Sequence, residues 1–87
     1  LVLANGLLFL AVEEGLLDRD FIEQRTRGFE CVAATVQSSF PAFVEAQTGV
    51  DEAVLRRVVR VLARGNTLIL TARGAEQHAN GADTVSA

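Results

Sequence analysis

The 87-residue chain has a single cysteine, Cys31, and a single histidine, His78. One cysteine excludes an internal disulfide framework and any zinc or iron–sulfur site built from several cysteines. Cys31 lies in the segment FECVAATV, which has the pattern of one helix face, so we expect a small buried apolar side chain there. A catalytic thiol needs an activating partner, and His78 is far away in sequence, so the pattern does not favour a cysteine nucleophile.

Positive charge is also scarce. All eight basic residues are arginines, and eleven acidic residues bring the net charge to −3. Non-specific nucleic-acid binding needs clustered positive charge that displaces counterions, so this class of function is disfavoured. Only Arg56, Arg57 and Arg60 lie close together. Because residues 56 and 60 share one face of a helix while 57 is rotated away, a solvated helix surface explains them better than a binding patch.

No hydrophobic run is long enough to span a membrane. The opening LVLANGLLFLAV has no basic region before it and contains Asn5 and Gly6. It ends at Glu13 and Glu14, short of the ~20 apolar residues that a span requires. We predict a buried helix over residues 2–14, apolar on almost every face. Its main apolar stripe is Leu3, Leu7, Leu10 and Ala11.

Signals for helices are abundant in the first 65 residues. Four more helices are predicted, over residues 18–27, 29–40, 41–49 and 51–65. Asp18 is a plausible N-cap, Pro41 suits a first helical position, and Gly49 suits a helix end. The last of these helices has the clearest apolar stripe, which we assign to Val54, Leu55, Val58, Val61 and Leu62.

Residues 67–72, TLILTA, are predicted to form the one strand. Consecutive apolar residues are typical of a strand covered on both faces in a parallel sheet. The predicted fold class is therefore α/β: a mostly helical segment of a three-layer Rossmann-like domain, with about five helices and one short strand. Because one parallel strand cannot form a sheet, we interpret residues 1–87 as a single excised piece of a larger domain. Its helical block is 1–65, and its strand and ligand loop are 66–87.

The loop after this strand is the candidate functional site. In open α/β sheets, ligands bind beyond the carboxyl ends of the strands, where Arg73, Gly74, Gln77, His78 and Gly81 would lie. Glycine lets the backbone approach a ligand, glutamine can pair with an amide or pterin edge through both donor and acceptor, and a helix opening near residues 81–83 would suit phosphate. The same residues are also compatible with a simple polar turn that carries one helix cap, so the residue chemistry alone leaves both interpretations open.

Three stretches are familiar when they are taken together and in order: LANGLLFLAVEEGLLDRDFIEQRTRGFE, VEAQTGVDEAVLRRVVRVLA and TLILTARGAEQHANGADTVSA. Over essentially the whole chain, they resemble the catalytic subunit of molybdopterin-dependent oxidoreductases of the nitrate reductase and formate dehydrogenase group. In that family a helical block leads into a strand and then a loop with the pattern Gly-x-x-Gln-His/Ser-x-x-Gly-x-Asp/Glu-x-Val. The matching positions here are Gly74, Gln77, His78, Gly81, Asp83 and Val85.

The resemblance implies a role in holding a bis(molybdopterin guanine dinucleotide) molybdenum cofactor. It assigns pterin contacts to Arg73, Gly74 and Gln77, with His78 as a further candidate whose alternative role is to cap the next helix. The family often has methionine where this chain has Arg73, and an arginine suits a phosphate or a pterin carbonyl. The metal's protein ligand and an iron–sulfur cluster lie elsewhere in the longer subunit. This piece alone is therefore expected to be inactive, without catalytic residues, metal ligands or a bound cofactor.

Several functional readings stay open. The residue pattern of the loop favours nitrate reduction, with a formate dehydrogenase alpha-subunit as the alternative. A different class of function is a small helical interaction module without a ligand, whose apolar helices contact a partner. We expect a cytoplasmic enzyme whose main partner for this piece is the rest of the catalytic subunit. The isolated piece is expected to form a homodimer, because 49% of its residues are hydrophobic and its predicted strand is unpaired.

Overall fold

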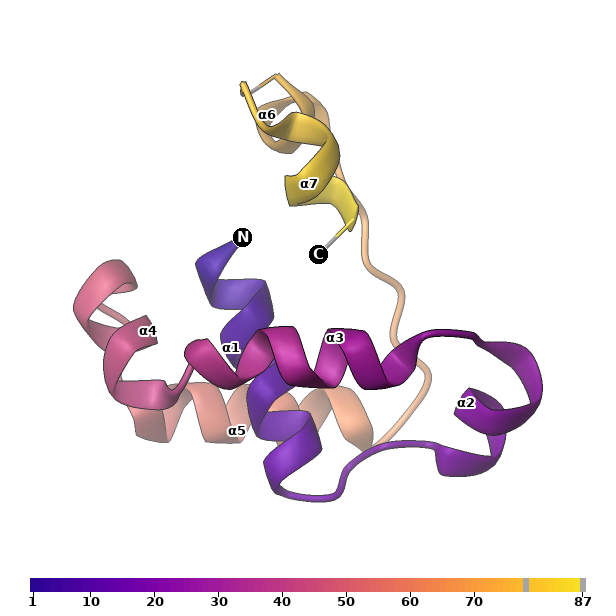
Figure 1. Cartoon of the computed structure of the whole chain (residues 1–87). Helices are drawn as coiled ribbons and strands as arrows, with labels where there is room; N and C mark the ends of the chain where they lie inside the picture. The colour runs from indigo at the N-terminus through magenta and orange to yellow at the C-terminus, as the bar shows by residue number, and fades with distance from the viewer. Residues whose placement is uncertain (78, 87) are drawn as a thin grey trace.

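Every regular element is a helix in the computed structural model, which describes residues 1–77 and 79–86. The helices are α1 (Val2–Glu13), α2 (Arg19–Arg25), α3 (Phe29–Thr35), the 3-10 turn η1 (Val36–Ser38), α4 (Pro41–Thr48), α5 (Glu52–Ala63), α6 (Arg73–Glu76) and α7 (Gly81–Ser86). The central element is α1, and α4, α5 and η1 all pack against it (Figure 1). Within the described residues, no helix is long and apolar enough to cross a bilayer.

The core lies where α1, α4 and α5 meet. Leu10 from α1, Val44 from α4, and Leu55 and Val59 from α5 are buried against one another. Gly6, one turn before Leu10, is also buried and faces Val44. Because glycine has no Cβ, α4 can approach the backbone of α1 closely at this point.

Three predicted helix ends in the first fifty residues, at Asp18, Pro41 and Gly49, are confirmed, whereas the helices predicted over 18–27 and 29–40 end earlier, at Arg25 and Thr35. The carboxylate of Asp18 accepts a hydrogen bond from the N–H of Phe21 at 2.9 Å and so caps α2. Pro41 occupies the first turn of α4. Gly15 and Gly49, which follow α1 and α4, adopt φ of 68° and 72°, the left-handed conformation that favours glycine.

The strand predicted at residues 67–72 is wrong, and the α/β fold class is wrong with it. The described chain is all-helical, and residues 66–72 form an extended connection with no regular structure. Leu68, Ile69 and Leu70 are 82%, 77% and 84% exposed. A strand forms only when its backbone N–H and C=O groups pair with a neighbouring strand, and the described residues offer none.

Two expectations about burial are also corrected. Cys31 is exposed, because α3 contributes no buried residue to the core. In α5 the buried residues are Leu55 and Val59, while Val54, Val58 and Val61 are 36%, 38% and 61% exposed. Of the stripe that we assigned, Leu55 and Leu62 are on the buried side of α5, whereas the three valines are exposed and Val59, which we did not assign, is core.

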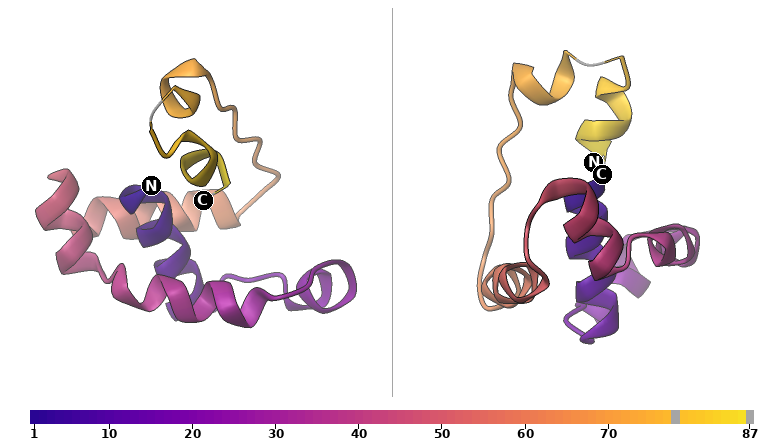
Figure 2. Two further views of the ribbon diagram at one scale, coloured as in Figure 1. Left: turned by 45° about the horizontal axis from the view of Figure 1, so that its top comes forward. Right: turned by 90° about the vertical axis from the view of Figure 1, so that its left-hand side faces the viewer.

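The last two helices stand to one side of the others. In Figure 2, α6 and α7 pack against each other, and the extended residues 66–72 connect them to the end of α5. Because of this arrangement, the chain is less compact than a typical domain of its length. The radius of gyration is 13.3 Å, whereas a compact chain of this size is expected at about 12 Å.

Candidate functional site

The structure places three of the predicted loop residues, Arg73, Gly74 and Gln77, within one helical turn, and Gly81 begins the next helix, α7. Arg73 and Gly74 begin α6, and Gln77 follows its last residue. The backbone N–H of Gln77 donates to the carbonyl oxygen of Arg73 at 2.9 Å, which closes the turn. Arg73, Gly74 and Gln77 are all exposed. His78, the fourth predicted residue, lies outside the described residues.

The surroundings of Gly74 fit a group that approaches from outside the chain. A Cβ built at Gly74 would meet no atom within 4 Å, and its φ is not in the left-handed region. Neither packing nor backbone conformation within the described chain therefore requires glycine here. Close backbone approach by a ligand is one physical reason for it.

The two flanking side chains supply hydrogen-bonding groups. No ion pair holds the guanidinium of Arg73 within the described part of the chain, so its donors are available to an acceptor such as a carbonyl or phosphate oxygen. The amide of Gln77 offers both a donor and an acceptor. Metal ligation is a different matter: among the described residues, no three His, Cys, Asp or Glu side chains gather closely enough to hold an ion.

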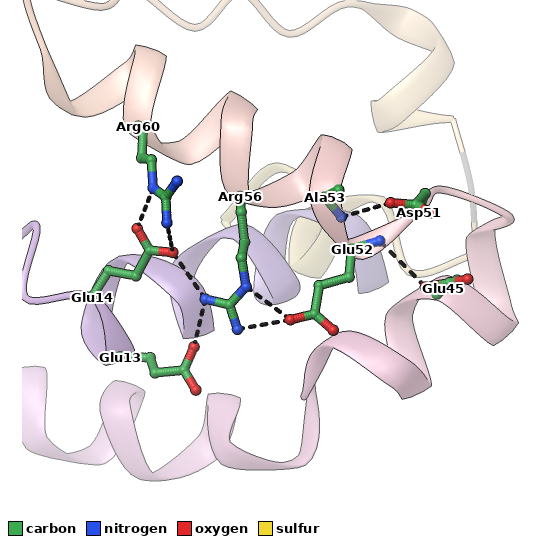
Figure 3. Close-up of polar contacts among 8 residues, drawn as sticks. All are labelled: Glu13, Glu14, Glu45, Asp51, Glu52, Ala53, Arg56 and Arg60. Atoms are coloured by element: carbon green, nitrogen blue, oxygen red, sulfur yellow. Dashed lines mark hydrogen bonds and ion pairs between the residues drawn. The ribbon is translucent and has the colours of Figure 1, made fainter.

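A second polar feature joins α1 to α5 (Figure 3). The carboxylate of Glu14 accepts from Nη1 of Arg56 at 2.8 Å, and from Nε and Nη2 of Arg60 at 2.7 and 3.0 Å. The side chain of Glu14 is only 14% exposed. Arg56 also contacts Glu52 at 2.7 Å and Glu13 at 3.0 Å, so five side chains form one connected group, which we call the ion cluster.

Electrostatics explain why the ion cluster forms. The C-terminal end of a helix carries partial negative charge, so Glu13 and Glu14 at the end of α1 are unfavourable there without cations nearby. The last turn of α1 has no basic residue of its own, and α5 supplies Arg56 and Arg60. Hydrogen bonds from Arg60 and then from Arg56 lower the pKa of Glu14 below its ordinary value of 4.5. The same contacts raise the pKa of Arg60, so both partners stay charged across the neutral range.

The ion cluster holds α1 and α5 together, and both of its guanidinium groups are already paired with carboxylates. Its contacts between α1 and α5 join residues 42 to 46 positions apart in sequence, so the local pattern of arginines did not reveal it. Only the pair Glu52 and Arg56, four residues apart on one helix, could have been found from spacing. The expectation that residues 56 and 60 share a face is confirmed, although that face contacts glutamates and not only solvent.

A shallow hollow of about 250 Å³ lies between α2 and α3. It is lined by Ile22, Glu23, Thr26, Arg27, Gly28, Phe29 and Glu30. None of the predicted cofactor residues lies on it. Most of its lining residues are exposed, and so it lacks the buried polar groups that usually orient a ligand.

Comparison with known proteins gives a consistent group of enzymes. The chain is 34% identical to the assimilatory nitrate reductase catalytic subunit of Bacillus subtilis over 84 residues, which is 95% of this chain and 12% of that protein. It is also 34% identical to formate dehydrogenase H of Escherichia coli over 86 residues, 98% of this chain and 12% of that protein. A thiosulfate reductase molybdopterin-containing subunit of Salmonella typhimurium is 40% identical over 52 residues, 60% of this chain and 7% of that protein.

The chain thus spans about an eighth of the length of these first two relatives. No protein-family model matches it, and no solved structure does. The relatives are nevertheless all oxidoreductases by name, and each of the first two aligns over almost all of this chain. The chain is therefore homologous, over nearly its whole length, to one segment of the catalytic subunits of molybdopterin oxidoreductases that include nitrate reductase and formate dehydrogenase.

Proposed function

We propose that this chain acts as a segment of a molybdopterin-dependent oxidoreductase and helps to hold its bis(molybdopterin guanine dinucleotide) cofactor. The observation that carries the proposal is the alignment with two such enzymes over 95% and 98% of the chain, a range that includes all of residues 73–78. In this proposal, the rest of a longer, cytoplasmic catalytic subunit surrounds the segment. That subunit supplies the metal's ligand and an iron–sulfur cluster, so the segment alone has no oxidoreductase activity.

The proposed role of the loop is to bind and orient the pterin. The exposed guanidinium of Arg73 donates to a carbonyl or phosphate oxygen of the cofactor. Gly74 lets that group come close to the backbone, and the amide of Gln77 pairs with a pterin edge through its donor and its acceptor. His78 is a further proposed contact. The bound cofactor supplies the two-electron chemistry, while these residues hold it in place.

The proposal is tested by Gln77→Ala in the subunit translated from the gene that encodes this chain. Loss of a two-sided hydrogen-bonding group leaves cofactor atoms unpaired, so cofactor retention should fall about tenfold or more. The measurement is molybdenum and pterin content per subunit after dilution and gel filtration. Gln24→Ala, at an exposed position on α2, is the matched control and should keep full content. Full molybdenum content in the Gln77 variant would show that the loop is only a structural turn.

Nitrate is the proposed substrate, with formate as the second candidate. The residue pattern of positions 73–85 favours the nitrate reductase group, and the relative named as assimilatory nitrate reductase supports nitrate as the substrate. The relative named as formate dehydrogenase H is equally similar, at 34% identity, and supports formate. Assays of the whole subunit with each substrate and an artificial electron carrier separate the two candidates.

A small helical interaction module remains the candidate from a different class of function. The all-helical fold of the described residues and their exposed apolar side chains support it. Flanking gene sequence distinguishes the two classes. An upstream Cys-x-x-Cys-x-x-x-Cys motif and several hundred further codons would support the enzyme, and a gene of these 87 codons would support the module.

A further inference from the structure

Helix α5 is apolar over a wider arc than its packing uses. Its core stripe, Leu55, Val59 and Leu62, faces α1 and is buried or half-buried. Immediately beside this stripe runs a second one, Val54, Val58 and Val61, which we call the valine row. Its members are spaced by four and three residues, so they lie in line along one side of the helix. The three valines of this row are exposed. The solvent-facing side of a surface helix is normally polar, so an exposed apolar row is unusual.

The outer edge of the valine row is positively charged. On a helix, Arg57 and Arg64 lie beside Val61, at four residues before it and three after it. No ion pair holds either arginine within the described part of the chain. The opposite side of α5 differs, because there Arg56 and Arg60 are already bound to glutamates. A surface that covers the valine row would therefore meet two unpaired guanidinium groups along one edge.

We infer that the valine row is a docking face for another part of the same catalytic subunit, namely an apolar segment bordered by carboxylates. The inference rests on the proposed function, since it takes the chain to be a segment of a longer subunit. Two observations support this occupant. The relatives are about eight times longer than the chain, which leaves ample protein to cover α5. Complementary charge also favours a partner whose Asp or Glu side chains reach Arg57 and Arg64.

The test measures how accessible the valine row is. In the isolated chain, with Cys31→Ser, a Val61→Cys variant should react quickly with a maleimide, because position 61 is the most exposed of the row. In the whole subunit from the encoding gene, the same cysteine should react at least roughly tenfold more slowly, because labelling then requires local opening of the protein. Peptide-level mass spectrometry reports residue 61 separately from the other cysteines of the subunit.

A charge reversal tests the occupant's chemistry. Arg57→Glu should restore fast labelling at residue 61 of the whole subunit, because it places a carboxylate opposite carboxylates. It should leave the thermal stability of the isolated chain unchanged, since Arg57 is exposed and has no ion-pair partner among the described residues. Arg19→Glu, an equal charge reversal at an exposed position of α2, is the control and should change neither measurement.

Four results would overturn the inference. These are equally fast labelling of residue 61 in the whole subunit and the isolated chain, slow labelling that Arg57→Glu leaves unchanged, protection of residue 61 in the isolated chain as it associates with a second copy, and a gene that encodes the 87 residues alone. The first three can occur while molybdenum retention still depends on Gln77. A failure of this inference is therefore distinct from a failure of the proposed function.

Discussion

Gly6 shows how one residue sets the distance between two helices. An added Cβ at this position would lie 2.6 Å from Cγ2 and 3.0 Å from Cγ1 of Val44. Valine is stiff at χ1, and Val44 is fully buried against Leu10 and Leu55, so it cannot turn away without losing those contacts. In the sequence, Gly6 served only as an argument against a membrane span, and its partner 38 positions later gave no local signal.

Gly6→Ala should therefore destabilise the chain. Overpacking costs about 1–3 kcal/mol, while alanine gains at most about 1 kcal/mol of helix propensity, and the net loss should be about 1–2 kcal/mol. Chemical denaturation followed by circular dichroism measures the free energy of unfolding. Gly74→Ala, where no atom lies within 4 Å, is the control and should cost nothing. A Gly6 variant that is as stable as the natural chain would contradict the close contact.

The ion cluster makes a separate prediction about pH. The pKa of Glu14 is lower in the folded chain than its ordinary value of 4.5, so the unfolded state binds this proton more readily. The stabilisation is thus fully present above pH 4.5 and is lost as pH falls through the folded pKa. Glu14→Gln should lower Tm at neutral pH, and the difference from the natural chain should shrink as pH falls below 4.5 and through the lowered pKa of Glu14. Glu23→Gln, at an exposed position of α2, is the control. A Tm difference that is independent of pH would show that the charge of Glu14 does not matter.

At the scale of elements, the sequence predicted what is decided locally. The cap at Asp18, the proline start of α4 and the glycine end at Gly49 involve neighbours within a few residues, and the structure confirms them. The strand at 67–72 depended on hydrogen-bonding partners that the described chain lacks, so an apolar run alone could not establish it. The cofactor loop is intermediate. Its residues were identified from order and resemblance, and the structure places Arg73, Gly74 and Gln77 in one turn, while their ligand contacts are still a prediction.

Helix α5 shows the limit of periodicity most clearly. Its sequence contains two apolar stripes offset by one residue, and both satisfy helical spacing. Only the position of α1 decides which stripe becomes core, and that contact joins residues more than forty positions apart.

The choice between the two stripes can be measured with two alanine substitutions. Leu55→Ala removes a fully buried side chain and should cost about 2–5 kcal/mol of unfolding free energy. Val54→Ala, one residue earlier on the valine row, should change it by less than about 1 kcal/mol in the isolated chain. Urea titration of both variants provides the comparison. Similar losses from both would mean that the valine row is also part of the core.

At the scale of the whole molecule, the connection between α5 and α6 contains the longest run of consecutive exposed large apolar residues in the described part of the chain. Leu68, Ile69 and Leu70 are consecutive and nearly fully exposed. Contiguous apolar surface of this kind is uncommon on monomeric proteins and normally contacts something. In the proposed subunit, the surrounding protein would cover it. In the isolated chain, the simplest cover is the same segment of a second copy, because a two-fold pair buries both at once.

The isolated chain should therefore self-associate, and residues 68–70 should be responsible. Sedimentation velocity across a concentration series should show a monomer that converts to a dimer as concentration rises. Ile69→Lys places a charge in the middle of the apolar stretch and should shift this equilibrium toward monomer by about tenfold or more, since an apolar contact is replaced by a charge that must stay hydrated. Phe21→Lys, which removes a single exposed aromatic side chain from α2, is the control and should leave the dimer intact. If the natural chain stays monomeric at the highest concentration reached, or if the Phe21 variant dissociates as readily as the Ile69 variant, the stretch is not what joins the two copies.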